Sequence, residues 1–514
     1  MSGEAHEECG VAAVCLANRD EEKALFYLYR MMLNLQHRGQ LSAGVTTYNA
    51  KRAQLINTYR NIGTVNEVFK TSSIAKSMEI FQSFSGSRGI GHTRYATCGP
   101  NDRSCAQPFE RKHGRMWKWF SFCFNGQLVN FNDLKAVLQE KVDYHFIHDS
   151  DTEIIMHFIA RELKGSKRPN IVAVFERLAK VFDGSYCIAF VNAYGEMVVA
   201  RDPLGFRPLV YAIKDGNLFA ASESNALINL GLHDFKPLEP GQLIHVDEHG
   251  KISFHQFAKS QRKAHCMFEW VYFSHVGSVI DNHSVYIARK NLGTELAARE
   301  TQKMGEDCIV CAVPDTAKAA ADAYAFKLGI PIVEGLIRNR FVGRTFIEGS
   351  DREGKVLNKY TVLKEVLQGK RVFLVDDSIV RGTTIKQIVK ILKEIGGATE
   401  VHIRITCPPI RAPCFYGIDM STVGELLAAH FDRDITSRDF SQKVCENIAK
   451  TMGADSLIYQ SMDGLVKSIG IPEKDLCNAC LTGRYPTPCG KKTYEKAIET
   501  FKSGISVSQR SYEA

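Results

Sequence analysis

The 514-residue sequence contains no uninterrupted hydrophobic run of the length that a membrane-spanning helix requires. It begins without a basic segment followed by an apolar stretch, so no secretory signal is predicted. Lysine and arginine outnumber aspartate and glutamate by 65 to 57, but they form no dense basic block of the kind that binds nucleic acid. Repeats and low-complexity tracts are also absent. We therefore expect a cytoplasmic, folded protein that binds neither membranes nor nucleic acid.

Fifteen cysteines are present, an odd number that argues against a complete disulfide framework. In a chain without an export signal they are expected to stay reduced, and most should be small core residues. Metal, cluster or nucleophile roles remain open for a few of them. The composition, 45 % hydrophobic and 24 % charged, is typical of folded proteins. The length predicts about two to four domains.

The pattern of apolar residues changes near the middle of the chain. The first 240 residues contain short strand-like runs and two clear helices, which is typical of an α+β layered domain. Beyond about residue 300, short apolar strands alternate with helices, which predicts a parallel sheet with crossover helices. A domain boundary is expected between 240 and 265. The predicted helices span 21–36, 151–163, 316–328, 357–368, 383–395 and 491–502.

The most specific motif is VFLVDDSIVRGTT, at 372–384. An apolar strand ends in Asp376 and Asp377, and a loop of small and hydroxyl residues leads into a helix. Backbone N–H groups at a helix start bind phosphate, and the carboxylates could accept ribose hydroxyls or hold Mg²⁺ through water. A capped strand–loop–helix turn without a ligand is the alternative. The motif resembles the phosphoribosyl-pyrophosphate (PRPP) loop of type I phosphoribosyltransferases, which implies PRPP binding by Asp376, Asp377, Ser378, Arg381, Gly382, Thr383 and Thr384.

A second motif, EECGVAAV, places Cys9 and a glycine before an apolar strand. A single cysteine in this setting is usually a buried small residue. Four further segments accompany it: LNLQHRGQLSAGV, GHTRYATCG, FNGQLVN and HDSDTE. The residues of interest in them are Arg38, Arg94, Thr97, Asn125, Gly126 and Asp151. Together these segments resemble the N-terminal-nucleophile (Ntn) glutamine amidotransferase domain.

This resemblance implies a catalytic role for the cysteine as the first residue of the mature chain, with its own α-amino group as the base. Met1–Glu8 is then a propeptide removed before Cys9. Asn125 and Gly126 would form the oxyanion hole. Arg94 would hold the α-carboxylate of glutamine and Asp151 its α-ammonium group. Arg38 and Thr97 complete the implied glutamine-binding set.

The two motifs in this order resemble the amidophosphoribosyltransferase family. The implied fold is a four-layer αββα Ntn hydrolase domain (9–245), an α/β type I phosphoribosyltransferase domain with a parallel sheet (260–470), and a C-terminal segment (471–514). The implied reaction transfers ammonia from glutamine to C1 of PRPP, which is the first step of de novo purine synthesis. The family also implies Mg²⁺ at Thr316, Asp376 and Asp377, and basic residues near the pyrophosphate at Arg338 and Arg344. Purine nucleotides as feedback inhibitors and a homo-oligomer, commonly a tetramer, are further expectations.

The pair Cys477 and Cys480 is by itself ambiguous between a redox pair, half a zinc site and half a cluster site. The iron–sulfur branch of the family adds two cysteines, which correspond here to Cys266 and Cys414. The resemblance thus implies a [4Fe–4S] cluster on four thiolates. Tetrahedral zinc and four uncoordinated thiols remain alternatives.

Some positions depart from the family pattern: Phe124 stands where histidine is usual, Arg338 replaces a lysine, and Glu348-Gly349 replaces Gln-Pro. Two other functions therefore stay under consideration. One is a PRPP-binding pseudo-enzyme or regulatory protein with an unprocessed glutaminase domain. The other is a different glutamine-dependent transferase, such as a sugar-phosphate aminotransferase.

Overall fold

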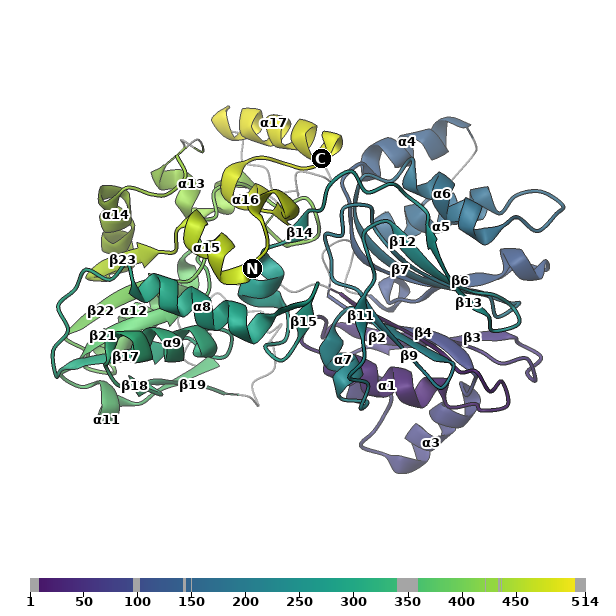
Figure 1. Cartoon of the computed structure of the whole chain (residues 1–514), viewed down its shortest axis with the longest axis horizontal. Coiled ribbons are helices and arrows are strands. Elements are labelled where there is room, and N and C mark those ends of the chain that lie inside the picture. Colours follow the sequence, from purple (N-terminus) through teal and green to yellow (C-terminus); the bar gives the residue numbers. More distant parts are fainter. Residues whose placement is uncertain are drawn as a thin grey trace.

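The computed structural model describes residues 9–95, 102–141, 145–148, 150–339, 359–420, 422–432, 435 and 437–503. Figure 1 shows two units side by side, with the C-terminal segment lying across the top of their junction. Within these ranges, no helix is both long enough and apolar enough to cross a lipid bilayer.

The first unit contains two stacked antiparallel sheets. Their strand orders are β11-β9-β10-β1-β4-β2-β3 and β13-β12-β8-β7-β6-β5. The strands are β1 (Gly10–Cys15), β2 (Ser42–Tyr48), β3 (Ile56–Ile62), β4 (Arg88–Arg94), β5 (Phe109–Arg111), β6 (Phe120–Leu128), β7 (Gly184–Asn192), β8 (Met197–Arg201), β9 (Val210–Lys214), β10 (Asn217–Ala221), β11 (Lys236–Pro237), β12 (Gln242–Val246) and β13 (Ile252–Gln256). The helices are α1 (Ala24–Asn34), α2 (Val65–Val68), α3 (Ile74–Ser83), α4 (Phe131–Lys141), α5 (Asp151–Glu162), α6 (Ile171–Ala179) and α7 (Ser224–Ile228).

Side-chain alternation along β1 explains why the layers stack in this order. Val11 and Ala13 pack into the core between the two sheets, whereas Ala12 and Val14 pack against α1 on the other face. A strand covered on both faces reads as a continuous apolar run, as GVAAVC does. Helices α4 to α6 cover the outer face of the second sheet. The resulting order of helix, sheet, sheet and helix confirms the expected αββα fold.

The first unit continues beyond residue 245. Strand β13 pairs with β12, so the second sheet runs as far as Gln256. The domain end expected at 245 falls inside β12, because the polar strand ISFHQ gave no clear apolar signal.

The second unit is built on a parallel five-stranded sheet in the order β18-β17-β21-β22-β23, as expected. The strands of the second unit and of the C-terminal segment are β14 (His265–Cys266), β15 (Val279–Ile280), β16 (His283–Ser284), β17 (Cys308–Ala312), β18 (Ile332–Val333), β19 (Leu336–Arg338), β20 (Tyr360–Val362), β21 (Arg371–Asp376), β22 (Glu400–Ile405), β23 (Ser456–Tyr459) and β24 (Leu476–Cys477). The α-helices there are α8 (Val285–Ala297), α9 (Lys318–Leu328), α11 (Lys364–Leu367), α12 (Thr383–Glu394), α13 (Leu427–Phe431), α14 (Gln442–Met452), α15 (Met462–Ile469), α16 (Ala479–Thr482) and α17 (Pro488–Lys502).

The helices expected at 316–328 and 383–395 are confirmed as α9 and α12, but the helix expected at 357–368 is wrong. There the described residues form the short strand β20, which pairs with β19, followed by the one-turn helix α11. β-Branched and aromatic residues in Tyr360–Val362 favour a strand once a partner strand is available.

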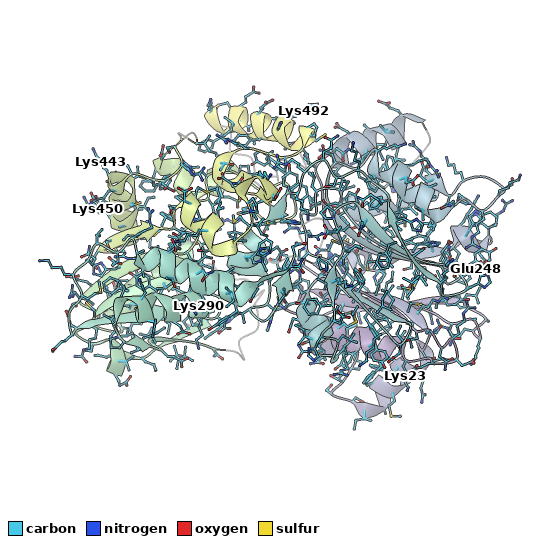
Figure 2. The ribbon with its side chains drawn as sticks, in the orientation of Figure 1. Lys23, Glu248, Lys290, Lys443, Lys450 and Lys492 are labelled. Atoms are coloured by element: carbon cyan, nitrogen blue, oxygen red, sulfur yellow. The ribbon has the colours of Figure 1, made fainter. Side chains whose placement is uncertain are left out.

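The C-terminal segment ties the two units together. Its strand β24 pairs in parallel with β14, and the backbone N–H of Cys489 in α17 donates to Asp183 of the first unit at 3.1 Å. The other end of α17 reaches the second unit, where Phe501 contacts His430 edge to face. Figure 2 shows Lys492 on the outer side of α17, and the neighbouring lysines of this helix are exposed.

The packing of α8 on α9 yields a stability prediction. A Cβ added to Gly293 would lie 2.0 Å from the carbonyl oxygen of Ala320, a backbone atom that cannot give way without moving α9. We expect Gly293→Ala to lower the free energy of unfolding of the second unit by about 1–3 kcal/mol. Gly114→Ala is the control, since no heavy atom lies within 4 Å of that added Cβ. Equal urea midpoints for both variants would contradict this close approach.

Candidate active site

One pocket in the first unit collects most of the residues expected to handle glutamine. It is lined by Cys9, Arg94, Tyr95, Cys105, Gln107, Phe109, Phe124, Gly126, Ser150, Asp151 and Thr152. Cys9 precedes β1, which pairs with β4, so the cysteine lies beside the end of β4 at Arg94. The half-buried thiol of Cys9 contacts the carbonyl oxygen of Tyr95 at 3.5 Å.

Strand β6 brings Gly126 to the wall of this pocket, and Asn125 directly precedes it in the strand. Among the described residues, the buried Nδ2 of Asn125 has no hydrogen-bond partner. Gly126 has φ of +150°, and a Cβ there would lie 2.0 Å from the carbonyl oxygen of Ser185, so only glycine fits. An unpaired buried donor is costly unless a ligand uses it. This arrangement suits the binding of an oxyanion.

Asp151, which also lines the pocket, begins helix α5 after the N-cap Ser150. Its Oδ1 accepts the N–H of Thr152 at 2.8 Å, while its buried Oδ2 has no partner within the described part of the chain. Burial raises the pKa of Asp151 to about 6, although hydrogen bonds and Arg94 act in the other direction. A carboxylate and a guanidinium on one pocket wall complement the charges of a free amino acid.

Arg38 lies behind Cys9 and is not among the residues that line the pocket. Its guanidinium donates to Glu223 at 2.5 Å and to Glu269 at 2.8 Å, and its Nε donates to the carbonyl oxygen of Cys9 at 3.3 Å. The assignment of Arg38 to glutamine binding stays a prediction. Thr97 and the segment Met1–Glu8 lie outside the described residues.

The loop between β21 and α12 forms the second candidate site, at the carboxyl edge of the parallel sheet. Thr316, which follows β17, donates its hydroxyl to Asp377, and Ser378 donates to the same carboxylate at 2.6 Å. The half-exposed Asp376 accepts the N–H of Asp377 at 2.9 Å. The structure thus brings together the three residues expected to contact Mg²⁺.

The rest of this loop leads directly into α12. Gly382 is the N-cap, and the next two residues, Thr383 and Thr384, form the first turn. Arg381 pairs with Glu425, its Nε lying 2.8 Å from the carboxylate, so this side chain braces the loop. Arg338 contacts Asp315 at 3.3 Å, next to Thr316. Arg344 and the segment Glu348-Gly349 lie outside the described residues.

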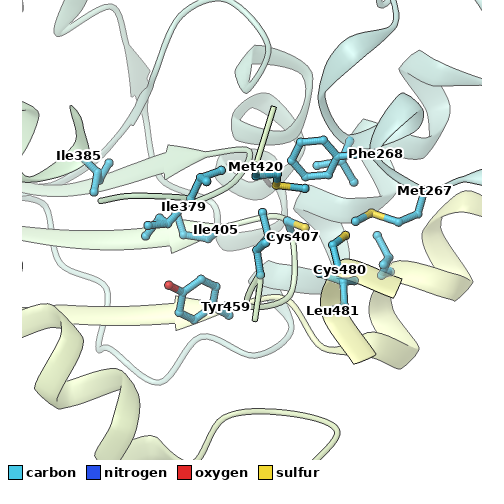
Figure 3. Packing of buried hydrophobic residues seen from close by; sticks show 14 of the residues in the cluster. Met267, Phe268, Ile379, Ile385, Ile405, Cys407, Met420, Tyr459, Cys480 and Leu481 are labelled. Carbon is cyan, nitrogen blue, oxygen red and sulfur yellow. The ribbon is translucent and has the colours of Figure 1, made fainter. Parts of the chain in front are cut away.

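Four cysteines come from three distant parts of the chain to one region. Pairing of β14 with β24 sets Cys266 opposite Cys477, and the N–H groups of Arg411 and Ala412 donate to the carbonyl oxygen of Cys480. Cys414 follows two residues later in the same buried core. Figure 3 shows Cys480 and Cys407 in this core, between the end of the sheet and the C-terminal segment.

The four thiols are buried and lie near one another, since Cys480 interacts electrostatically with Cys266, Cys414 and Cys477. Cys480 is 7 % exposed and the other three are 8 % exposed, whereas Ala479 and Leu481 on either side of Cys480 are 2 % and 1 % exposed. Within the described ranges, no group of three or more histidine, cysteine, aspartate or glutamate side chains is close enough to hold a single metal ion. Four neighbouring thiols nevertheless fit the donor set of an iron–sulfur cluster by their chemistry.

Known proteins are similar to this chain over most of its length. The family profile described as "Glutamine amidotransferase domain" matches residues 79–280. An amidophosphoribosyltransferase of Methanothermobacter thermautotrophicus is 37 % identical over 489 residues, covering 94 % of this chain and 96 % of the relative. The amidophosphoribosyltransferase of Bacillus subtilis is also 37 % identical, covering 94 % of both chains. This chain belongs to the amidophosphoribosyltransferase family.

Solved structures of amidophosphoribosyltransferases extend the similarity to three dimensions. The B. subtilis glutamine PRPP amidotransferase complexed with ADP and GMP has a TM-score of 0.80 and 35 % identity, covering 94 % of this chain and 98 % of that one. A structure described as the allosteric regulatory enzyme of purine biosynthesis has a TM-score of 0.81 and 34 % identity, covering 98 % and 100 %. The family resemblance inferred from the motifs is confirmed, and a sugar-phosphate aminotransferase is excluded.

Several residues around the two sites were not predicted. Gln107, Tyr95 and Cys105 line the glutamine pocket, and Glu223 and Glu269 hold Arg38. None of them stands in a spacing that by itself indicates a site. Only the pairing of distant segments reveals them.

The raised pKa of Asp151 predicts a pH dependence. Below about pH 6 this carboxyl is protonated and cannot pair with an α-ammonium group, so kcat/KM for glutamine should fall with decreasing pH. A free α-amino group at Cys9 must be unprotonated to act as the base, so the pH profile should show a second fall in kcat/KM below about pH 7.7–8.0. In Asp151→Asn the fall below about pH 6 should disappear while the one at higher pH remains. The variant should also lower kcat/KM about 10- to 100-fold at alkaline pH. Persistence of both falls in the variant would contradict the assignment.

Proposed function

We propose that this chain hydrolyses glutamine at Cys9 and transfers the ammonia to C1 of PRPP. The products are 5-phosphoribosylamine, glutamate and pyrophosphate, and the reaction is the first step of de novo purine biosynthesis. The observation that carries this proposal is the presence, in one chain of this family, of the pocket at Cys9 and of the Thr316–Asp377 loop site.

The first half-reaction needs Cys9 at the N-terminus, so we infer that Met1–Glu8 is removed. The freed α-amino group accepts the thiol proton, and the thiolate attacks the glutamine carboxamide. Asn125 and Gly126 stabilise the oxyanion that forms. The Nδ2 of Asn125, which is unpaired among the described residues, supports this assignment, because an oxyanion would give it a hydrogen-bond acceptor. Arg94 and Asp151 hold the α-carboxylate and α-ammonium groups.

The second half-reaction takes place at the loop between β21 and α12. Backbone N–H groups from Gly382 onward face the 5-phosphate, and Asp376 accepts the ribose hydroxyls. Thr316, Asp376 and Asp377 supply hard oxygen donors that fit Mg²⁺, which would neutralise the charge of the leaving pyrophosphate. Arg338 and Arg344 add positive charge there.

For the four cysteines we propose a [4Fe–4S] cluster with a structural role. The proximity of Cys266, Cys414 and Cys477 to Cys480 supports it, as does the chemistry of four thiolates. The cluster would fix the C-terminal segment to the middle of the chain. We further propose regulation by purine nucleotides, because the related B. subtilis structure is a complex with ADP and GMP. We also propose a homotetramer, as the family resemblance implies.

Separate ablation of the two sites tests the proposed function. Cys9→Ala should abolish glutamine-dependent formation of 5-phosphoribosylamine, while ammonia-dependent formation from PRPP remains, because the second site is intact. Asp377→Asn should lower both rates by at least about 100-fold, since both need PRPP. Both are measured by pyrophosphate release.

Cys445→Ala is the control, because that half-buried cysteine belongs to neither site. If the unsubstituted chain binds PRPP but forms no product from either nitrogen source, the protein is the PRPP-binding pseudo-enzyme instead.

Mass spectrometry tests processing and the cluster together. Protein purified without oxygen should give a denatured mass starting at Cys9, and a native mass excess of four irons and four sulfides. Cys480→Ser should lose the visible iron–sulfur absorbance, whereas Cys445→Ser should keep it. A chain retaining Met1–Glu8 would contradict an active glutaminase in that preparation, and bound zinc would contradict only the cluster.

A further inference from the structure

Among the described strands, only β5 pairs with the outer edge of β6, and this pairing stops before the proposed oxyanion residues. Strand β5 pairs only with Phe120–Phe122, and β6 then continues through Phe124 to Asn125 and Gly126 without it. Alternate residues of a strand direct their backbone groups to the same edge, so Phe124 and Gly126 both face this side. Without another partner, the buried N–H and C=O of Phe124 would be unpaired.

Two side chains take the place of the missing strand. The Oε1 of Gln107 accepts the N–H of Phe124 at 2.7 Å, and the Nε2 of His92 lies 3.0 Å from the carbonyl oxygen of Phe124. Burial lowers the pKa of His92 to about 3, so the ring is neutral and donates through Nε2. Both the N–H and the C=O of Phe124 are therefore bonded, and they hold the part of β6 that carries Asn125.

The other end of Gln107 reaches the opposite wall of the pocket. Its Nε2 donates to the hydroxyl of Thr152 at 3.3 Å, and the N–H of Thr152 donates to Asp151. The backbone around Gln107 is itself anchored, because Arg60 donates to the carbonyl oxygens of Ala106 and Pro108. Gln107 is 4 % exposed and lines the pocket. One anchored side chain thus joins the strand of the oxyanion donors to the first turn of α5.

We propose that Gln107 is a positioning residue that fixes the separation between the oxyanion donors, Asn125 and Gly126, and the ammonium acceptor, Asp151. This proposal rests on the proposed glutamine hydrolysis. Glutamine must place its α-ammonium group at one wall and its carboxamide at the other, so the distance between the walls decides whether the carboxamide meets the thiolate. A displacement of about 1 Å can cost about 100-fold in rate.

The test uses Gln107→Leu in the full chain, which keeps side-chain bulk but removes both hydrogen bonds. We expect kcat for glutamine to fall about 10- to 100-fold, and by more than KM rises. Ammonia-dependent synthesis from PRPP should stay within about twofold, since that site lies in the other unit. Gln82→Leu on α3 is the matched control, because the same exchange there affects an exposed residue.

A milder pair of variants covers the case in which Gln107→Leu does not fold. Thr152→Val removes the bond from Gln107 together with the contact of the Thr152 hydroxyl with Asp151 at 3.5 Å, and Thr152→Ser retains both, so kcat should fall in the first and stay near that of the unsubstituted protein in the second. The proposal is overturned if kcat of a folded Gln107→Leu stays within about twofold of the unsubstituted protein. It is also overturned if the glutamine and ammonia reactions fall together, or if Thr152→Val and Thr152→Ser behave alike. Absence of glutamine hydrolysis in the unsubstituted protein contradicts the proposed function itself, and this proposal with it.

Discussion

A buried ionic network around Glu269 connects the nucleophile to the rest of the molecule. Arg38 and Arg207, both from the first unit, hold this carboxylate, which belongs to the segment that leads into the second unit. Burial raises the pKa of Glu269, but the two arginines outweigh it and hold the pKa below its ordinary value. The charges stay paired in the interior, where removal of one partner would leave another uncompensated. Because Arg38 also donates to the carbonyl oxygen of Cys9, the position of the nucleophile depends on contacts between the two units.

The contacts between the two units also include strand β6, which carries Gly126, and the segment that carries Cys414. Arg207 donates to the carbonyl oxygen of Tyr416, and Ser185 donates to that oxygen at 2.8 Å while accepting the N–H of Gln127 at 3.1 Å. Tyr416 lies two residues after Cys414. The segment that carries a proposed cluster ligand therefore packs directly on the strand that presents Gly126. A structural cluster would stabilise the glutaminase pocket from behind, although it takes no part in the chemistry.

Much of the architecture was predictable because local patterns carried it. The strand β21 and helix α12 flank a loop whose motif can be read directly in the sequence, and β1 is apolar on both faces because two layers cover it. Prediction failed where the local pattern was weak. The segment Tyr360–Val362 becomes a strand only because β19 lies beside it, and β13 is too polar to be recognised without β12. Helices α3, α4 and α6 were also not singled out.

The sequence by itself determined which chemistry the chain carries. Cys9, Asn125–Gly126 and Asp376–Asp377 stand in motifs whose residue types can be matched without coordinates. The tertiary structure decided how those groups are held. Only the bonds between distant segments show that Arg38 pairs with Glu223 and Glu269, and that Gln107 bonds to the backbone of Phe124. The physical reason is that buried hydrogen bonds and ion pairs join residues far apart in the chain, and no local spacing records which partner each polar group finds.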